Sequence, residues 1–331
     1  MPEHDVVGIG NAIVDIIGRC DDAFLARHGY TKGSMQLVDA AGAAKLYDAM
    51  GPAVEISGGS GANTIVGVAS FGGRAGFIGK TADDQFGRIF GHDIRTAGVT
   101  FTTPAATKGS EPTGRCLVLV TPDGQRTMHT FLGVSPQLGG GEVDPALIAS
   151  ARIVYLEGYL FDRPEAKAAF RQAAGIAAQG GRQVALSLSD AFCVDRHRGE
   201  FVEFVRASVA ILLANEAEIT SLYQTTSFDE AARRAQMDTK LAALTRSEQG
   251  SVILAEGTRI AVPADPVAKV VDTTGAGDLY AAGFLFGLAR GRDLETAGRL
   301  GSLAAAEVIS HLGARPEKKL SDLARAKGLF T

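Results

Sequence analysis

Runs of apolar residues alternate along the chain with stretches in which apolar and polar positions follow a helical spacing. The apolar runs predict buried strands over residues 6–10, 75–78, 153–156, 184–188, 210–213, 241–245 and 251–255. The helical stretches predict helices over residues 84–97, 164–179, 201–207, 215–223, 277–289, 294–311 and 320–326. Buried strands that alternate with helices form a mainly parallel sheet covered on both faces, so the pattern predicts a doubly wound α/β fold.

Two regions, residues 16–50 and 100–133, break this alternation with shorter segments. In the second, an apolar run over 115–120 leads into Thr121-Pro122-Asp123-Gly124, a sequence typical of a β-turn between two strands. Both regions predict a small separate β-sheet, which we call the lid. The sequence therefore predicts a large α/β domain over 1–15, 51–99 and 134–331, and a lid over 16–50 and 100–133.

The composition is that of a globular protein with a sizeable core, because 46% of the 331 residues are hydrophobic and 21% are charged. A formal net charge of -4 gives no reason to expect nucleic acid or a membrane surface as a partner. Three widely spaced cysteines without a Cys-x-x-Cys pair favour a reducing cytoplasm over a disulfide framework or a zinc site. The N-terminus lacks a signal-peptide pattern, and the apolar stretch 279–289 is too short to span a bilayer.

A turn rich in small residues leads into the helix predicted from 277, and its sequence is Asp272-Thr273-Thr274-Gly275-Ala276-Gly277-Asp278. Backbone N–H groups that converge at a helix N-terminus bind anions, through free donors and the helix dipole together. A carboxylate beside such an anion suits another task, which is to take a proton from an attacking hydroxyl during phosphoryl transfer. The local pattern alone equally permits Asp278 only to stabilise the helix N-terminus.

Two common nucleotide-binding motifs are missing from the sequence. No Gly-x-x-x-x-Gly-Lys-Ser/Thr segment occurs, and Gly8-Ile9-Gly10 lacks the third glycine of a dinucleotide fingerprint, since Ile13 occupies that place. The second absence disfavours a nicotinamide-dependent oxidoreductase. Phosphate chemistry is therefore expected at the 275–278 turn.

The 272–278 turn resembles the C-terminal signature of the ribokinase (PfkB) family of carbohydrate and nucleoside kinases. The family's other signature is similar to Gly58-Gly59-Ser60-Gly61-Ala62-Asn63-Thr64, continuing through residues 79–87. The resemblance covers nearly the whole chain and implies a ribokinase-like fold, with a doubly wound sheet and a small β-sheet lid. It also implies an ATP-dependent kinase in which Asp278 is the catalytic base and the amides of Gly275, Ala276 and Gly277 form the anion hole.

The same resemblance implies two ion sites. Asn215 and Glu218 lie three residues apart on one face of a predicted helix, and they match a family position tied to Mg²⁺, which oxygen ligands often hold through water. A helix capping box explains this pair as well. Asp272 and Thr274 match a position that helps to hold a monovalent cation such as K⁺ in many members, and a simple cap of the turn is the alternative for Asp272.

Contacts to ATP are implied in the loop 245–250, which is similar to a family loop along the ATP phosphates, and in a later helix whose apolar side suits adenine. The residues are Asn215, Thr245, Ser247, Gly250, Ser302 and Ala305. Core packing explains the last two equally well.

An acceptor site is expected after the first strand, where open α/β sheets place ligands. Asp15 can accept hydrogen bonds from two adjacent hydroxyls, as a carboxylate does when it binds a vicinal diol. Turn chemistry is the alternative for each residue taken singly. The expected acceptor residues are Asn11, Asp15, Gly58, Gly59, Ser60, Asn63 and Tyr159.

The middle of the chain resembles adenosine kinases more than ribokinases. The matching segments are 111–115, 158–160 and 186–192. This resemblance implies transfer of the γ-phosphate of ATP to the 5′-hydroxyl of adenosine, as in purine salvage. Tyr159 and Phe161 are expected near the purine, and Met128 and Phe131 are expected in the lid. Arg126 matches a lid arginine that reaches the transferring phosphate, with an exposed turn arginine as the alternative.

Other assignments remain open at this point. The acceptor could be a free sugar such as ribose or fructose, or it could be inosine or guanosine. A non-catalytic nucleoside-binding protein on the same scaffold is an alternative from another class, which the intact Asp278 disfavours. The protein is expected to be a monomer or a homodimer, because the exposed strand edges of a lid can pair with a second copy.

Overall fold

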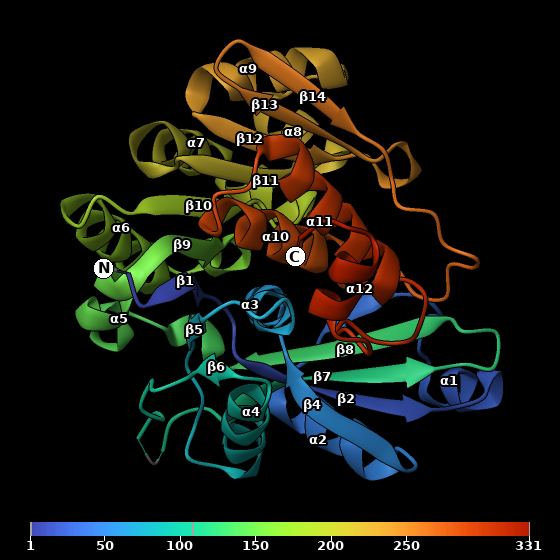
Figure 1. Ribbon diagram of the computed structural model, residues 1–331. Coiled ribbons are helices and arrows are strands. Elements are labelled where there is room, and N and C mark those ends of the chain that lie inside the picture. Colours follow the sequence, from blue (N-terminus) through green and yellow to red (C-terminus); the bar gives the residue numbers. More distant parts are fainter. Residues whose placement is uncertain (1, 108, 331) are drawn as a thin grey trace.

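A nine-stranded, mainly parallel sheet forms the centre of the larger part of the molecule (Figure 1). The computed structural model describes residues 2–107 and 109–330. In spatial order the strands are β14 (Thr258–Val262), β13 (Ser251–Ala255), β12 (Leu241–Thr245), β11 (Ile211–Asn215), β10 (Gln183–Ser187), β9 (Ala151–Glu157), β1 (His4–Ile9), β5 (Ala75–Ile78) and β6 (Val99–Thr100). Only β12, β13 and β14 pair antiparallel among the described strands of this sheet. The predicted α/β fold with a mainly parallel sheet is confirmed.

Side chains that alternate along the central strands build two hydrophobic cores, one on each face of this sheet. Val6 and Tyr155 belong to one core, whereas their chain neighbours Val7 and Val154 belong to the other. The first core packs under α3 (Ser60–Ser70), α10 (Ala276–Ala289), α11 (Leu294–Val308) and α12 (Leu320–Ala326). The second packs under α5 (Pro145–Ser150), α6 (Pro164–Gln179), α7 (Ala191–Ser208), α8 (Glu216–Tyr223) and α9 (Phe228–Asp238). Helices therefore cover both faces, as predicted.

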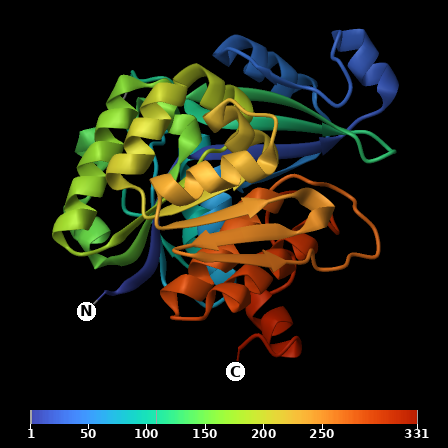
Figure 2. The same ribbon diagram turned by 90° about the horizontal axis from the view of Figure 1, so that it is seen from above.

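A second, five-stranded sheet adjoins the first, and α4 (Gln85–Thr96) packs between β4 and β6. In spatial order its strands are β3 (Met35–Leu37), β8 (Arg126–Gly133), β7 (Thr113–Val120), β2 (Ile13–Arg19) and β4 (Ala53–Gly58). The outer face packs against α1 (Asp22–His28) and α2 (Ala40–Ala49), which Figure 2 shows beyond the edge of the large sheet. The inner face carries an apolar cluster that also contacts Leu312 of the larger part.

The two sheets divide the chain at other places than the predicted boundaries. β4 lies within 51–99, which the sequence assigns to the large domain, yet it pairs with β2 in the small sheet. β2 begins at Ile13, inside the predicted segment 1–15, because the chain passes directly from β1 into the small sheet, where Ile13 pairs with Gly58 and Gly114. Residues 13–15 and 53–58 therefore belong to the small sheet and not to the large one. The division into a large domain and a lid stays a prediction.

Helix α7 begins at Ala191, ten residues before the predicted start, because Asp190 caps it by accepting a hydrogen bond from the N–H of Cys193. Its first half is polar and ends in a kink at His197, so hydrophobic spacing does not reveal it. Helix α3 also lacks a predicted counterpart, since its first turns are rich in glycine, serine, asparagine and threonine. Within residues 2–107 and 109–330, no helix has the length and apolar character needed to cross a membrane.

Candidate active site

Helix α10 begins with the small-residue turn that carries Asp278. Gly275 directly precedes the helix with a φ of 79°, in the left-handed region that favours glycine. A Cβ atom at Gly275 would also lie 2.8 Å from the Cβ of Ala314. A Cβ at Gly277, by contrast, would meet nothing within 4 Å. The turn thus requires glycine at 275, and it leaves open space beside Gly277 at the helix N-terminus.

Three N–H groups of this turn have no acceptor among the described residues, and they belong to Gly275, Gly277 and Asp278. The N–H of Ala276 donates to the carbonyl of Thr273 at 3.2 Å and is used within the turn. Free donors at a helix N-terminus attract anions, with help from the helix dipole. Of the three amides predicted to form the anion hole, those of Gly275 and Gly277 are therefore free and that of Ala276 is not, while the amide of Asp278 is free as well.

The carboxylate of Asp278 contacts two side chains at the start of α3. Ser60 Oγ donates to its Oδ1 at 2.6 Å, and Asn63 Nδ2 donates to its Oδ2 at 3.1 Å. Burial raises the pKa of Asp278 above its usual range, while these two donors and the charge of Arg315 oppose that rise. Asn63 Oδ1 is buried without a partner among the described residues, so it can accept a hydrogen bond from a bound hydroxyl.

A cavity of about 260 Å³ opens at this carboxylate and lies between the two sheets. Most of the residues predicted for the acceptor and the phosphoryl group line it, together with Thr274 of the predicted cation site. The former are Asp15, Gly59, Ser60, Asn63, Arg126, Tyr159, Gly275 and Asp278. Six further lining residues lie outside the sequence predictions for polar contacts, namely Ile13, Cys116, Val118, Met128, Ser189 and Ala314.

Asp15 enters the cavity from β2 as a half-buried carboxylate with no protein hydrogen-bond partner among the described residues. Burial raises its pKa to about 6, Arg315 and Arg126 lower it, and Asp278 adds a further rise. Gly58 does not line the cavity, but a Cβ there would lie 2.4 Å from the Asp15 carboxyl group. A side chain at position 58 would therefore collide with the Asp15 carboxylate. Both carboxylate oxygens of Asp15 can accept hydrogen bonds from a bound molecule.

The inner face of the small sheet gives the cavity an apolar wall. Cys116, Val118 and Met128 come from β7 and β8, with Ile13 beside them. Phe131 lies on the other face of β8, in the core under α1 and α2. Phe131 therefore lies in the small sheet, as expected, but faces away from the cavity. Phe161, which the sequence places near the purine, does not line the cavity, because it stacks inside the core. A small hydrophobic thiol such as Cys116 carries no motif that could have predicted its place here.

Tyr159 also lines the cavity, with 37% of its surface exposed, from the short 3-10 helix η3 (Gly158–Asp162). Its N–H donates to Ser189 Oγ at 3.2 Å. Cys193 Sγ donates to the carbonyl of Gly158 at 3.4 Å. Phe161, on the same short helix, is fully buried and lies 4.0 Å from the ring of Phe201, measured between centroids. The loop before α7 and the start of α7 therefore hold the backbone that carries Tyr159.

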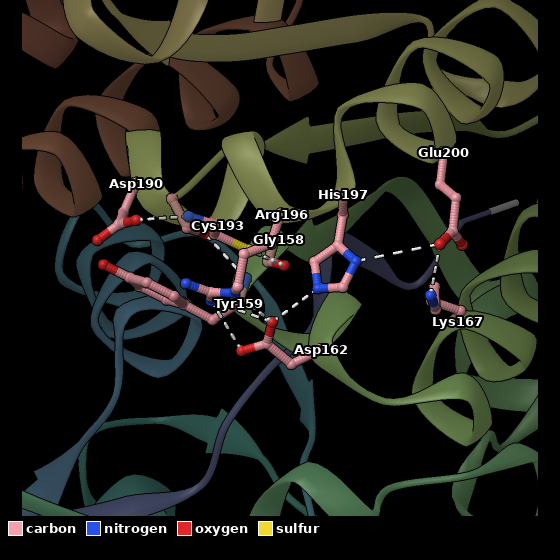
Figure 3. A network of polar contacts seen from close by, with 10 residues as sticks. Gly158, Tyr159, Asp162, Lys167, Asp190, Cys193, Arg196, His197 and Glu200 are labelled. Atoms are coloured by element: carbon pink, nitrogen blue, oxygen red, sulfur yellow. Dashed lines mark hydrogen bonds and ion pairs between the residues drawn. The ribbon is translucent and has the colours of Figure 1, made fainter. Parts of the chain in front are cut away.

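A second group of contacts fastens the end of η3 to α7 (Figure 3). Asp162 accepts hydrogen bonds from two nitrogens of Arg196, at 3.0 and 3.1 Å. His197 Nε2 lies 2.7 Å from Asp162 Oδ1, at the kink of α7. Lys167 pairs with Glu200 at 2.8 Å beside this histidine. Asp162 thus fixes the distance between η3 and α7, while Lys167 joins α6 to α7.

Asn11 does not reach the cavity, because a buried carboxylate occupies its side chain. Its N–H and its Nδ2 donate to Glu157 at 3.0 and 2.7 Å, and its Oδ1 accepts from Ser135 Oγ at 3.0 Å. Glu157 also accepts from the N–H of Gly61 at 2.8 Å. Burial raises the pKa of Glu157 to about 7, and these donors oppose the rise. Asn11 and Glu157 thus join β1, β9 and α3 beneath the acceptor site.

Arg126 and Asp272 form an ion pair, although the sequence assigns them to different partners. Their side chains are 8% and 4% exposed. The Asp272 carboxylate also accepts from the N–H of Thr274 at 3.0 Å and from the N–H of Gly313 at 2.9 Å. A guanidinium and two amides therefore bind the carboxylate of Asp272, which serves here as the partner of Arg126 and as a cap of the turn. A role of Asp272 and Thr274 in holding K⁺ stays a prediction.

Asn215 and Glu218 form a capping box at the start of α8. Each backbone N–H donates to the other side chain at 2.9 Å, and Asn215 Nδ2 donates to Glu218 Oε1 at 2.6 Å. Among the described residues, no group of three or more histidine, cysteine, aspartate or glutamate side chains could hold a metal. The carboxylate keeps lone pairs that can accept from metal-bound water, so the pair fits Mg²⁺ held through water.

The residues predicted for ATP lie apart from the cavity. Asn215 and Thr245 pair at the ends of β11 and β12, so the loops that follow these two strands start side by side at this edge of the sheet. Gly250 has a φ of 80° and follows Ser247 in the turn before β13. Ser302 Oγ donates to the carbonyl of Pro263 and accepts from the N–H of Asp265, so it fastens the loop after β14. Ala305 packs against the core. Their contact with ATP stays a prediction.

Comparison with known proteins assigns the chain to a family. A family model described as pfkB family carbohydrate kinase matches residues 48–320. The chain belongs to the pfkB family of carbohydrate kinases. The two signatures at residues 58–64 and 272–278 lie within this match, and the structure brings both to one cavity. The predicted membership of the ribokinase (PfkB) family is confirmed.

Solved structures and sequence relatives agree with this assignment. A probable sugar kinase from Rhizobium etli CFN 42 is 50% identical, with a TM-score of 0.92 and 100% of both chains covered. The adenosine kinase from Sinorhizobium meliloti is 52% identical, with a TM-score of 0.90 and coverage of 98% of this chain and 99% of that chain. The adenosine kinase of Saccharomyces cerevisiae is 26% identical over 96% of this chain and 98% of its own. This pfkB kinase is therefore a phosphotransferase that acts on a hydroxyl group of a sugar or nucleoside.

Proposed function

We propose that this pfkB kinase transfers the γ-phosphate of ATP to the 5′-hydroxyl of a nucleoside, with adenosine as its preferred acceptor. One observation carries the proposal: Asp278 lies beside the free amides at the start of α10 and lines the same cavity as Asp15, whose carboxylate has no partner among the described residues. A base, an anion site and a diol-binding group thus meet in one place. The apolar wall of Cys116, Val118 and Met128 gives a purine a surface that a bare sugar would leave unused.

In this reaction Asp278 takes the proton of the 5′-hydroxyl as its oxygen attacks the γ-phosphorus. The bond between that phosphorus and the oxygen bridging to the β-phosphate breaks, and ADP leaves with AMP as the product. Burial raises the pKa of Asp278, which makes it a stronger base than an exposed carboxylate. The N–H groups of Gly275 and Gly277 hold the negative charge on the transferring group.

Mg²⁺ and ATP complete the proposal on the side of the large sheet. Mg²⁺ would neutralise charge on the ATP phosphates, and Asn215 with Glu218 would accept hydrogen bonds from its water ligands. ATP would lie along the 245–250 loop and against α11. We leave K⁺ out, because Arg126 pairs with Asp272. A cytoplasmic place in purine salvage follows from the same proposal.

Replacement of the base tests the chemistry. We expect Asp278→Asn to lower kcat by about 10² to 10⁴, the range that a general base contributes, with little change in KM for ATP. The matched control is Asp293→Asn, which changes a carboxylate at the N-cap of the next helix, α11, where asparagine caps equally well. Turnover of Asp278→Asn at the level of this control would disprove the role of Asp278.

A panel of acceptors with labelled ATP tests the nucleoside. We expect the highest kcat/KM for adenosine, followed by inosine and guanosine, with ribose and fructose far behind. A sugar kinase is the second candidate, because the Rhizobium etli protein described as a probable sugar kinase is 50% identical over the whole chain. A higher kcat/KM for a free sugar would establish that alternative. Tight adenosine binding without turnover would indicate a non-catalytic nucleoside-binding protein.

A further inference from the structure

Three consecutive residues after α11 contact separate parts of the proposed site. Gly313 donates its N–H to Asp272 at 2.9 Å. Ala314 lines the cavity and fills the space beside Gly275, where any side chain would collide with it. Arg315 extends from the same segment to the bend between β4 and α3. No sequence motif marks these residues, because their importance arises from contacts with positions about 40 to 260 residues earlier in the chain.

The guanidinium of Arg315 binds backbone carbonyl groups at both ends of the segment 57–62. Its Nε and Nη2 donate to the carbonyl of Ser57 at 3.0 and 2.6 Å, and Nη2 also donates to Ser57 Oγ at 3.0 Å. Its Nη1 donates to the carbonyl of Ala62 at 3.2 Å. Asp93 holds Ser57 from the other side, accepting from its N–H at 2.8 Å. The stretch between these anchors contains Ser60, which donates to Asp278.

The charge of Arg315 is not neutralised by direct contact. Every hydrogen bond of its guanidinium goes to an uncharged carbonyl or hydroxyl oxygen. Asp15 and Asp278 likewise have no ion-pair partner among the described residues, although burial disfavours their charges. The positive charge of Arg315 lowers the pKa of both carboxyl groups. Among charged groups, Asp93 acts most on the guanidinium of Arg315, followed by Asp15 and Asp278, so the guanidinium is the positive group shared by three carboxylates.

We propose that Arg315 is a positioning residue for phosphoryl transfer, which fixes the bend at Ser57–Ala62 and keeps a positive charge beside the carboxylates of Asp278 and Asp15. The proposal rests on the proposed function, since Arg315 acts on two carboxylates that line the same cavity. The planar guanidinium of arginine suits this role, because its several N–H groups can donate to two carbonyl groups at once while the side chain stays positively charged. Lysine supplies the charge without the guanidinium, and glutamine supplies donors without the charge.

Other titratable groups also act on Asp278 and must be kept constant. The side chains that share its electrostatic surroundings are Asp15, Tyr155, Glu157, Tyr159, Glu218 and Arg315. Only Arg315 among them is a cation. Its replacement therefore removes the one positive charge from this set, whereas the others stay in place.

The test compares the pH dependence of kcat in Arg315→Gln, Arg315→Lys and Arg115→Gln. We expect the acid limb of Arg315→Gln to move to higher pH, with kcat at pH 6 lowered about tenfold more than kcat at pH 8.5. Arg315→Lys should keep the wild-type acid limb, while its KM for the acceptor rises because the guanidinium is lost. Arg115 is a second buried arginine, in β7 against the rings of Phe86 and Phe131, and its replacement should leave the acid limb unchanged.

A second measurement does not depend on turnover. Carbon-13 labelling of aspartate carboxyl groups, with Asp278→Asn for assignment, gives the titration midpoint of Asp278 by NMR. We expect a higher midpoint in Arg315→Gln than in wild type, and a wild-type midpoint in Arg315→Lys. Equal midpoints in wild type and Arg315→Gln would overturn the proposal. If no acceptor is phosphorylated but the midpoint shifts, the proposed function and the positioning role fail together, and only the effect of the Arg315 charge on the pKa of Asp278 stands.

Discussion

At the scale of single residues, Asp15 combines a free carboxylate with a raised pKa of about 6. Only the ionised form accepts hydrogen bonds from two hydroxyls with both oxygens, so kcat/KM for the acceptor should fall as pH drops through about 6. The pKa of Asp15 affects the stability of the folded protein in the opposite direction to its effect on kcat/KM. Because the folded-state pKa lies above the usual value, the contribution of Asp15 to stability is present at low pH and is lost as pH rises through about 6.

Asp15→Asn checks this assignment by steady-state kinetics. We expect kcat/KM for the acceptor to fall about 10- to 100-fold, the effect of losing a hydrogen bond to a charged group, with KM for ATP unchanged. Asp144→Asn is the control, since Asp144 caps α5 far along the chain by accepting from Ala146 N–H at 2.9 Å. Equal KM values for the acceptor in both variants would show that Asp15 does not bind it.

The residues that sequence predicted correctly for this cavity belong to strong local motifs. Asp278 and Ser60 lie in segments whose small residues already indicate close approach of the backbone, and the structure joins them at 2.6 Å. Glu157 and Cys116 gave no such signal. Glu157 acts on Asn11, which lies 146 positions earlier, and a contact over that distance depends on the parallel pairing of β1 and β9. Long-range partners of this kind are set by the fold and cannot be inferred from spacing.

At the scale of elements, η3 owes its position to α7. Asp162 at the end of η3 binds Arg196 and His197, and Tyr159 on the same short helix lines the cavity. We expect Asp162→Asn to raise KM for a nucleoside severalfold and to leave KM for ATP unchanged, because Tyr159 loses its fixed distance from α7. Acceptor and ATP titrations at fixed pH measure both values.

Asp195→Asn provides a matched control within α7. Asp195 pairs with Arg198 and accepts from Ser221 Oγ at 2.6 Å, but it does not contact η3. A rise in acceptor KM of the same size in both variants would mean that helix stability, and not the position of Tyr159, causes the effect. The first half of α7 illustrates why such elements escape prediction, since its polar surface follows from pairing with η3 rather than from burial.

At the scale of the whole molecule, hydrophobic periodicity predicted the large sheet because its strands are buried on both faces. The small sheet was harder to delimit. β4 has mostly exposed or half-buried positions, and it joins this sheet through pairing with β2, about 40 residues away in sequence. The two sheets meet at the cavity, where Arg126 of β8 pairs with Asp272 before α10. A buried ion pair therefore joins the small sheet to the turn before α10.

Removal of Arg126 tests whether this ion pair holds the sheets together. Arg126→Met leaves Asp272 with only the N–H groups of Thr274 and Gly313, and an unpaired buried charge is strongly destabilising. We expect faster amide hydrogen exchange in β7 and β8, and more ATP hydrolysis per phosphoryl transfer, because water enters a cavity that closes less often. Lys32→Met removes ion pairs to Asp22 of α1 and to Asp123 in the turn between β7 and β8, neither of which involves the large sheet, so it should change neither value. Wild-type exchange and hydrolysis in Arg126→Met would show that the sheets are held by other contacts.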